Sequence, residues 1–139
     1  MLIKEENNSM FSGQVKFCDR KFGRVDGYAI SSHVGSLCAT NNTRICVATN
    51  LMQNSNKSRE ISFFGLFEGR NGSNRAEYMR EYFHNTLIND ELFYYNFDKA
   101  VSRTFEKIER DFNYDPRYDG DYSIASSVIC VIVGKFRPI

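Results

Sequence analysis

The stretch FFGLFEGRNGSNRAEYMREYFHNTL, residues 63–87, decides the fold that this chain is expected to adopt. It opens with a short aromatic run, continues through glycine and asparagine, and ends with apolar residues at helical spacing. The aromatic run is too short for a helix, whereas the later spacing suits an amphipathic one. We therefore predict a buried strand over Ile61–Phe67, a turn over Glu68–Gly72, and a helix that starts after Ser73 or Asn74.

The segments before this stretch alternate in polarity or are rich in β-branched residues, which favours strands. The expected strands are Met10–Phe17, Tyr28–Ser32 and Arg44–Leu51, with a polar connection over residues 53–60. Residues 1–10 are polar and are expected to be flexible.

A second helix is predicted directly after the first. It starts near Asn89 or Asp90, because phenylalanine, valine and isoleucine recur at helical spacing from there to Phe112. Pro116 and Gly120 are expected to end it.

The run SIASSVICVIVG, residues 123–134, is dense in β-branched residues and is interpreted as a central strand. A tight turn is expected after it, at Gly134 and Lys135. The order of strands, two adjacent helices and a further strand is an α+β pattern. We expect antiparallel sheets with a flanking helix pair on one face.

Composition limits the size of the fold and its partners. At 139 residues the chain fits one domain, and 42% hydrophobic residues can form a core. A net charge of +1 does not attract nucleic acid, and the apolar run Ser126–Val133 is far shorter than the roughly 20 residues that cross a bilayer. The start, MLIKEENNS, lacks a secretory apolar region, so we expect a cytoplasmic protein without nucleic-acid or membrane partners.

Cysteines, histidines and aspartates supply further candidate sites. The four cysteines include no C-x-x-C pair and are expected to be reduced thiols, so a zinc site is not predicted. His84 follows Phe83 in the first predicted helix, where a structural histidine is favoured over a general base. Asp115, Asp119 and Asp121 lack the spacing of a calcium-binding loop and are interpreted as a solvated loop.

Residues 63–87 resemble the region of type 2C protein phosphatases in which a buried strand ends in the motif F-D-G-H-G-G and a helix follows. The aromatic strand, an acid, the following glycine and an amphipathic helix are all present. Residues 98–112 look like the family's second helix, and residues 121–135 look like its G-S-T-A-type strand. The segment RICVATNL, residues 44–51, looks like the members whose phosphatase domain is attached to leucine-rich repeats.

The resemblance implies a two-metal site for Mg²⁺ or Mn²⁺ that activates a water for attack on a phosphomonoester. Glu68 stands where the family has its bridging aspartate, and the carbonyl of Gly69 would approach a metal. Arg70 replaces the family's histidine and puts a cation beside the expected metals, which opposes their binding and suits a phosphate instead. The loop that carries an acidic pair in the family offers the neutral Asn41 and Asn42.

Three functions therefore remain open. The first is a phosphatase-like domain with a degraded metal site, a pseudophosphatase that binds proteins, phosphoproteins among them, in signalling. The second is an active Mg²⁺- or Mn²⁺-dependent protein Ser/Thr phosphatase that completes its site through a dimer or a missing segment. The third is a structural dimerisation domain.

The length also bears on assembly. A complete type 2C domain resembles a sandwich of two sheets and is considerably longer, so residues 1–139 are expected to be a single truncated or minimal domain. Half a sandwich leaves one sheet face uncovered. We expect a symmetric homodimer to cover it, or the rest of a larger protein.

Overall fold

The computed structural model describes residues 2–4, 16–19, 21, 23–36, 39–53 and 56–136. Within these residues there are six strands, two α-helices and one short 3-10 helix. In chain order they are β1 (Leu2–Lys4), β2 (Lys16–Cys18), β3 (Tyr28–Ile30), β4 (Thr43–Gln53), β5 (Asn56–Arg70), α1 (Asn74–Ile88), α2 (Phe97–Tyr114), the 3-10 helix Pro116–Tyr118 and β6 (Ile124–Phe136).

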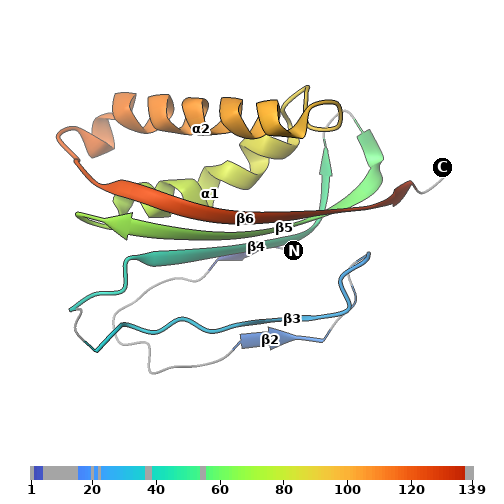
Figure 1. Ribbon diagram of the computed structural model, residues 1–139, viewed down its shortest axis with the longest axis horizontal. Coiled ribbons are helices and arrows are strands. Elements are labelled where there is room, and N and C mark those ends of the chain that lie inside the picture. The colour runs from blue at the N-terminus through green and yellow to red at the C-terminus, as the bar shows by residue number, and fades with distance from the viewer. Residues whose placement is uncertain are drawn as a thin grey trace.

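The strands form two antiparallel sheets. The larger has the order β1-β4-β5-β6, and β2 pairs with β3 in a separate two-stranded sheet. Figure 1 shows α1 and α2 together on one side of the larger sheet and the β2–β3 pair on the other. The predicted α+β class, with antiparallel sheets and a flanking helix pair, is confirmed.

The core lies between the larger sheet and the helices. Side chains along β5 alternate between the two faces of the sheet, so every second side chain points into this core. Ile61, Phe63 and Phe67 point to the helices and are fully buried. The ring of Phe83, on α1, lies 6.2 Å from that of Phe63 and 5.8 Å from that of Phe67. The aromatic run that was predicted to be buried therefore anchors α1 to the sheet.

The first predicted helix is confirmed, with Ser73 at its N-cap position, but the second starts later than expected. The backbone N–H of Leu92 donates to the Asp90 side chain, which holds a turn where the helix was predicted to begin. The side chain of Asn96 accepts a hydrogen bond from the backbone of Lys99 and caps α2. Phe93 is nevertheless buried, so it fits the apolar stripe because it packs in the core, although it does not lie in the helix.

β5 is longer than the sequence indicated. It starts at Asn56, so most of the polar connection predicted over residues 53–60 is strand. It also runs past Phe67 to Arg70, which narrows the predicted turn to Asn71 and Gly72. These two residues have φ angles of 57° and 123°, in the region that favours asparagine and glycine, and they reverse the chain into α1.

β6 departs from two predictions. It is the last strand in the order of the larger sheet and not a central one. It also continues through Gly134 and Lys135 to Phe136, where a turn was expected. Its high β-branched content arises because both of its faces carry apolar residues, not because it has two neighbours.

Part of the N-terminal prediction falls on residues that the structure does not describe. Of the expected strand Met10–Phe17, residues 10–15 lie outside the described residues, and Lys16–Cys18 form β2. Leu2–Lys4 pair with β4, although residues 1–10 were expected to be flexible. None of the described helices is long and apolar enough to cross a membrane.

The face of the larger sheet that lies away from the helices is incompletely covered. The ring of Tyr28, on β3, meets that of Phe64 edge-on at 5.9 Å, so the β2–β3 pair covers part of it. A groove of about 340 Å³ lies beside that contact and is lined mainly by apolar residues of β3, β4, β5 and β6. Leu66 and Val128 remain 43% and 70% exposed there.

Candidate functional site

Glu68 and Arg70 occupy alternate positions near the end of β5, so they share the sheet face opposite the helices. Both are exposed. In the register of the sheet, Thr43 and Ser126 flank Glu68 on the two neighbouring strands, and Ile124 is opposite Arg70. Glu68 thus has a hydroxyl-bearing residue on each of the two neighbouring strands, and the guanidinium of Arg70 two residues further along β5.

Gly69 lies on the other face and is buried. Its backbone N–H donates to the carbonyl oxygen of Asn42 at 3.0 Å. A Cβ added there would lie 2.5 Å from the carbonyl oxygen of Gly72, which no side chain can tolerate without backbone movement. The fold therefore requires glycine at this position for the close approach of the turn that leads into α1.

The turn over Asn41–Thr43 lies directly against this strand end. The backbone N–H of Thr43 donates to Asn41 Oδ1 at 3.0 Å, and Asn41 Nδ2 donates to Ser32 Oγ at 2.8 Å. The two asparagines that stand in place of an acidic pair are therefore adjacent to Glu68 and Gly69. The Asn41 side chain forms hydrogen bonds within its own turn and to Ser32. The backbone carbonyl of Asn42 accepts the hydrogen bond from the Gly69 N–H.

Arg44 holds this turn against α1, a role that the sequence did not indicate. Its Nε donates to Glu77 Oε2 at 2.7 Å, and its guanidinium also donates to the carbonyl oxygen of Asn41 at 2.8 Å. Glu77 is shared with Arg80 on the next turn of α1. The Arg44 guanidinium is committed to these partners and its side chain is only 11% exposed, so it is not available to bind a phosphate.

The residues around Glu68 do not suit a resident dication. They offer one carboxylate, the hydroxyls of Thr43 and Ser126, and the cationic Arg70. Mg²⁺ and Mn²⁺ favour several oxygen ligands with carboxylates among them, and a guanidinium repels them. Within the described residues, no three acidic, histidine or cysteine side chains gather closely enough to hold a metal ion.

The aspartates that follow α2 serve local structure. Asp115 forms an ion pair with Arg117 at 2.6 Å, and the hydrogen bond from that guanidinium lowers the pKa of Asp115. Hydrogen bonds from Ser123 and Asn74 likewise lower the pKa of Asp121. These carboxylates position the chain between α2 and β6.

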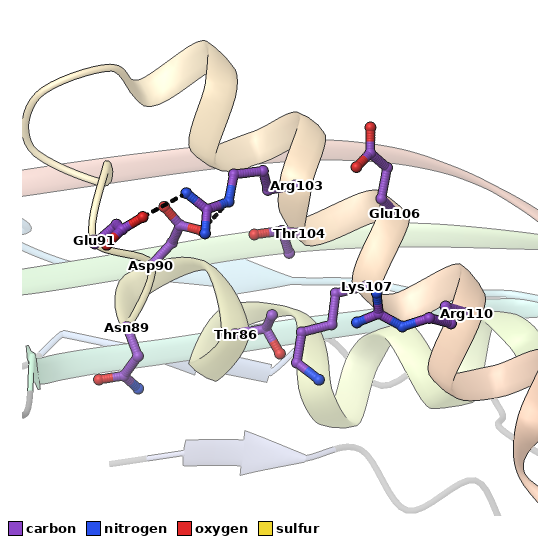
Figure 2. Close-up of a pocket in the computed structure, with 9 residues that line it drawn as sticks. All are labelled: Thr86, Asn89, Asp90, Glu91, Arg103, Thr104, Glu106, Lys107 and Arg110. Carbon is purple, nitrogen blue, oxygen red and sulfur yellow. Dashed lines mark hydrogen bonds and ion pairs between the residues drawn. The ribbon is translucent and has the colours of Figure 1, made fainter.

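A polar depression of about 540 Å³ lies between α1 and α2 near the end of α1 (Figure 2). Arg103 on α2 points across it and forms ion pairs with Asp90 at 3.2 Å and Glu91 at 2.9 Å. Glu106, Lys107 and Arg110 also line it, so its wall carries three acidic and three basic side chains. The ion pairs of Arg103 fasten the α1–α2 connection, and the equal number of acidic and basic side chains gives no preference for an anion or a cation.

His84, on the helix side of the sheet, is 2% exposed. Its Nδ1 lies 3.7 Å from Sγ of the buried Cys46, and its ring lies 6.0 Å from that of Phe63. The structural role expected for this histidine agrees with its burial, since neither it nor Cys46 is accessible to a substrate.

Comparison with known proteins adds a family context. No protein-family model matches the chain. Three curated relatives from Oryza sativa subsp. japonica are named probable protein phosphatase 2C 52, 2C 56 and 2C 27, with 35% identity over 77 residues, 38% over 80 and 29% over 84. The alignments cover 52%, 54% and 58% of this chain but 15%, 22% and 24% of the relatives.

The chain thus spans less than a quarter of the length of the curated relatives it matches. About half of it is similar to type 2C phosphatases, and together with the α+β architecture this supports a type 2C phosphatase-like domain. The likeness to members attached to leucine-rich repeats stays a prediction.

Proposed function

We propose that this type 2C phosphatase-like domain is a pseudophosphatase, a module that binds phosphorylated proteins in signalling without efficient hydrolysis. The observation that carries the proposal is the composition of the strand end. A lone carboxylate, Glu68, stands between two hydroxyl residues and beside Arg70. The hydroxyls and the guanidinium can donate hydrogen bonds to a phosphate. The single carboxylate supplies too few anionic oxygens for two dications.

Arg70 is the proposed phosphate ligand. It is exposed, and the ion pairs that the described residues form with acids do not include it. A guanidinium can donate two parallel hydrogen bonds to phosphate oxygens. Thr43 and Ser126 flank the neighbouring position and can add hydroxyl donors.

Glu68 has opposite roles in the two leading functions, which makes it the best residue to test. In a pseudophosphatase without a metal, its negative charge repels the phosphate. In an active Mg²⁺- or Mn²⁺-dependent phosphatase, the second candidate, it is a metal ligand and the missing carboxylates come from a partner or a further segment. The family resemblance of the acid-glycine pair favours that second candidate.

The test is calorimetric titration with a phosphothreonine peptide and its unphosphorylated form, in EDTA and then in Mn²⁺. Arg70→Ala is expected to weaken phosphopeptide binding about tenfold or more, as for the loss of a charged hydrogen bond. Arg24→Ala removes an exposed arginine elsewhere and should leave the Kd unchanged. In EDTA, Glu68→Gln should bind more tightly than the wild type.

The same proteins decide between the candidates. Manganese-stimulated release of phosphate from the peptide, lost in Glu68→Ala, would reject the pseudophosphatase in favour of the active enzyme. If neither Mn²⁺ nor the phosphopeptide shifts the Tm, both give way to a structural dimerisation domain. A cytoplasmic location is part of the proposal, and it rests on the free thiols of Cys18, Cys46 and Cys130.

A further inference from the structure

Glu68 and Arg70 carry opposite charges on the same face of β5, and both side chains are exposed. Among the residues that the structure describes, neither of them forms an ion pair. The residues opposite them in the register of the sheet are uncharged, with Thr43 and Ser126 beside Glu68 and Ile124 beside Arg70. The end of β5 therefore presents one negative and one positive charge that no opposite residue neutralises.

The spacing of these two charges matches the repeat of an extended peptide. In a β-strand, side chains two residues apart point to the same face, and their Cα atoms are roughly 6.8 Å apart. An extended peptide that lies along the end of β5 has the same period. Two of its side chains at alternate positions can therefore reach Glu68 and Arg70 at once, while the residue between them points away from the sheet.

Building on the proposed phosphate binding by Arg70, on which this inference rests, we propose that the ligand is a phosphopeptide with a lysine or arginine two residues from the phosphorylated residue. Arg70 binds the phosphate, and Glu68 binds the cationic side chain. The two charges of the peptide then have the order and the spacing of the two charges on β5.

Glu68 makes the site selective as well as weaker for other peptides. Its carboxylate repels the phosphate on Arg70 in every phosphopeptide. A cationic side chain beside Glu68 offsets this repulsion and adds an ion pair, whereas a neutral side chain does neither. Selectivity of this kind combines attraction for one ligand with repulsion of its competitors.

The experiment is calorimetric titration of the full chain, in EDTA, with four phosphothreonine peptides that differ in the position of one lysine. The lysine is two residues after the phosphothreonine, two residues before it, one residue after it, or replaced by alanine. At least one of the peptides with the two-residue spacing should bind roughly two- to fivefold more tightly than the alanine peptide, the range of an exposed ion pair. The lysine one residue away should give no gain, because it points away from the sheet.

Glu68→Gln removes the charge and keeps the shape of the side chain. It should abolish the difference between the lysine and alanine peptides, and it should tighten binding of the alanine peptide because the repulsion of the phosphate is lost. Glu106→Gln is the matched control. Glu106 is an exposed acid on α2, on the other side of the larger sheet (Figure 1), so all four Kd values should stay unchanged.

Three results would contradict this specificity. If Arg70→Ala weakens binding of the peptides but neither two-residue spacing improves it, Arg70 binds phosphate and Glu68 selects no cation. If the gain from lysine persists in Glu68→Gln, another group binds the lysine. If Arg70→Ala leaves every Kd unchanged, or no peptide binds, the proposed phosphate binding fails and the specificity fails with it.

Discussion

The two faces of the larger sheet are built from alternate residues of the same strand and have opposite characters. On the helix face, Phe63 and Phe67 of β5 are fully buried against α1. On the other face, Leu66, Glu68 and Arg70 are exposed. The helix face is covered by α1 and α2 of the same chain, whereas the other face carries the candidate site and the exposed apolar side chains of Leu66 and Val128. Stability and recognition are thus separated by a side-chain alternation of period two.

The largest expected difference between the faces lies in the cost of removing an apolar side chain. Phe83→Ala should lower the free energy of unfolding by about 3–5 kcal/mol, since it leaves a cavity among the rings of Phe63, Phe67 and Phe105. Leu66→Ala on the open face should cost about 1 kcal/mol or less. Urea unfolding followed by circular dichroism measures both. Equal losses would mean that the open face is as tightly packed as the core.

A second difference concerns polar groups, because the helix face also buries an arginine. Arg75 Nε donates to the carbonyl oxygen of Ser123 at 2.6 Å, and its guanidinium pairs with Glu109 at 2.7 Å. The same group lies 4.3 Å from the ring centre of Phe112, so Arg75 joins α1 to α2 and to the start of β6.

Arg75→Gln should therefore lower the free energy of unfolding by about 2–3 kcal/mol, the cost of losing hydrogen bonds from a charged donor. The matched control is Arg110→Gln, since Arg110 is on the exposed side of α2 with a side chain that is 62% exposed. The control should leave the urea midpoint unchanged. A similar midpoint shift in both variants would show that the burial of Arg75 contributes nothing.

The fold was predictable to the extent that hydrophobic patterns decide it. The aromatic run of β5 and the stripe of α1 gave the buried strand and its helix, because both patterns follow directly from burial on one side. The start of α2 was not predictable from the stripe. Phe93 contacts the core from a turn, and the local hydrogen bond to Asp90 that forms this turn competes with the helix.

The residues of the candidate site were predicted from the family motif, whereas the hydrogen bonds that connect them to the rest of the fold were not. Glu68, Gly69 and Arg70 were identified from the family motif, and their alternation places the acid and the arginine together on one face. The link from α1 through Arg44 to the Asn41 turn joins residues 33 positions apart, so no local pattern contains it. The close approach of the Gly72 carbonyl oxygen, which requires glycine at position 69, likewise depends on how the chain turns back after β5.

Gly69 offers a test at the boundary between the two faces. Gly69→Ala should lower the free energy of unfolding by about 1–3 kcal/mol, because its Cβ would overlap the carbonyl oxygen of Gly72, a backbone atom that cannot rotate away. Glu68→Ala, one residue earlier and exposed, is the matched control and should change it by about 0.5 kcal/mol at most. If Gly69→Ala left the free energy of unfolding unchanged, the turn into α1 would be able to move away from the added Cβ without cost.

The smallest expected effect is a change in the pH dependence of stability. Hydrogen bonds from Ser123 and Asn74 lower the pKa of Asp121 in the folded chain. A carboxylate with a lowered folded pKa stabilises the fold above its ordinary pKa of about 4, and this contribution is lost as the pH falls through the folded value. The Tm of the wild type should therefore decrease between pH 5 and pH 2 more steeply than that of Asp121→Asn.

Asn74→Ala refines this measurement, because it removes one donor and leaves the hydrogen bond of 2.7 Å from the Ser123 backbone to Asp121. Its Tm should fall with pH less steeply than the wild type and more steeply than Asp121→Asn. Three parallel curves would mean that the carboxylate of Asp121 does not stabilise the connection between α1 and β6, and that the order of this loop comes from packing.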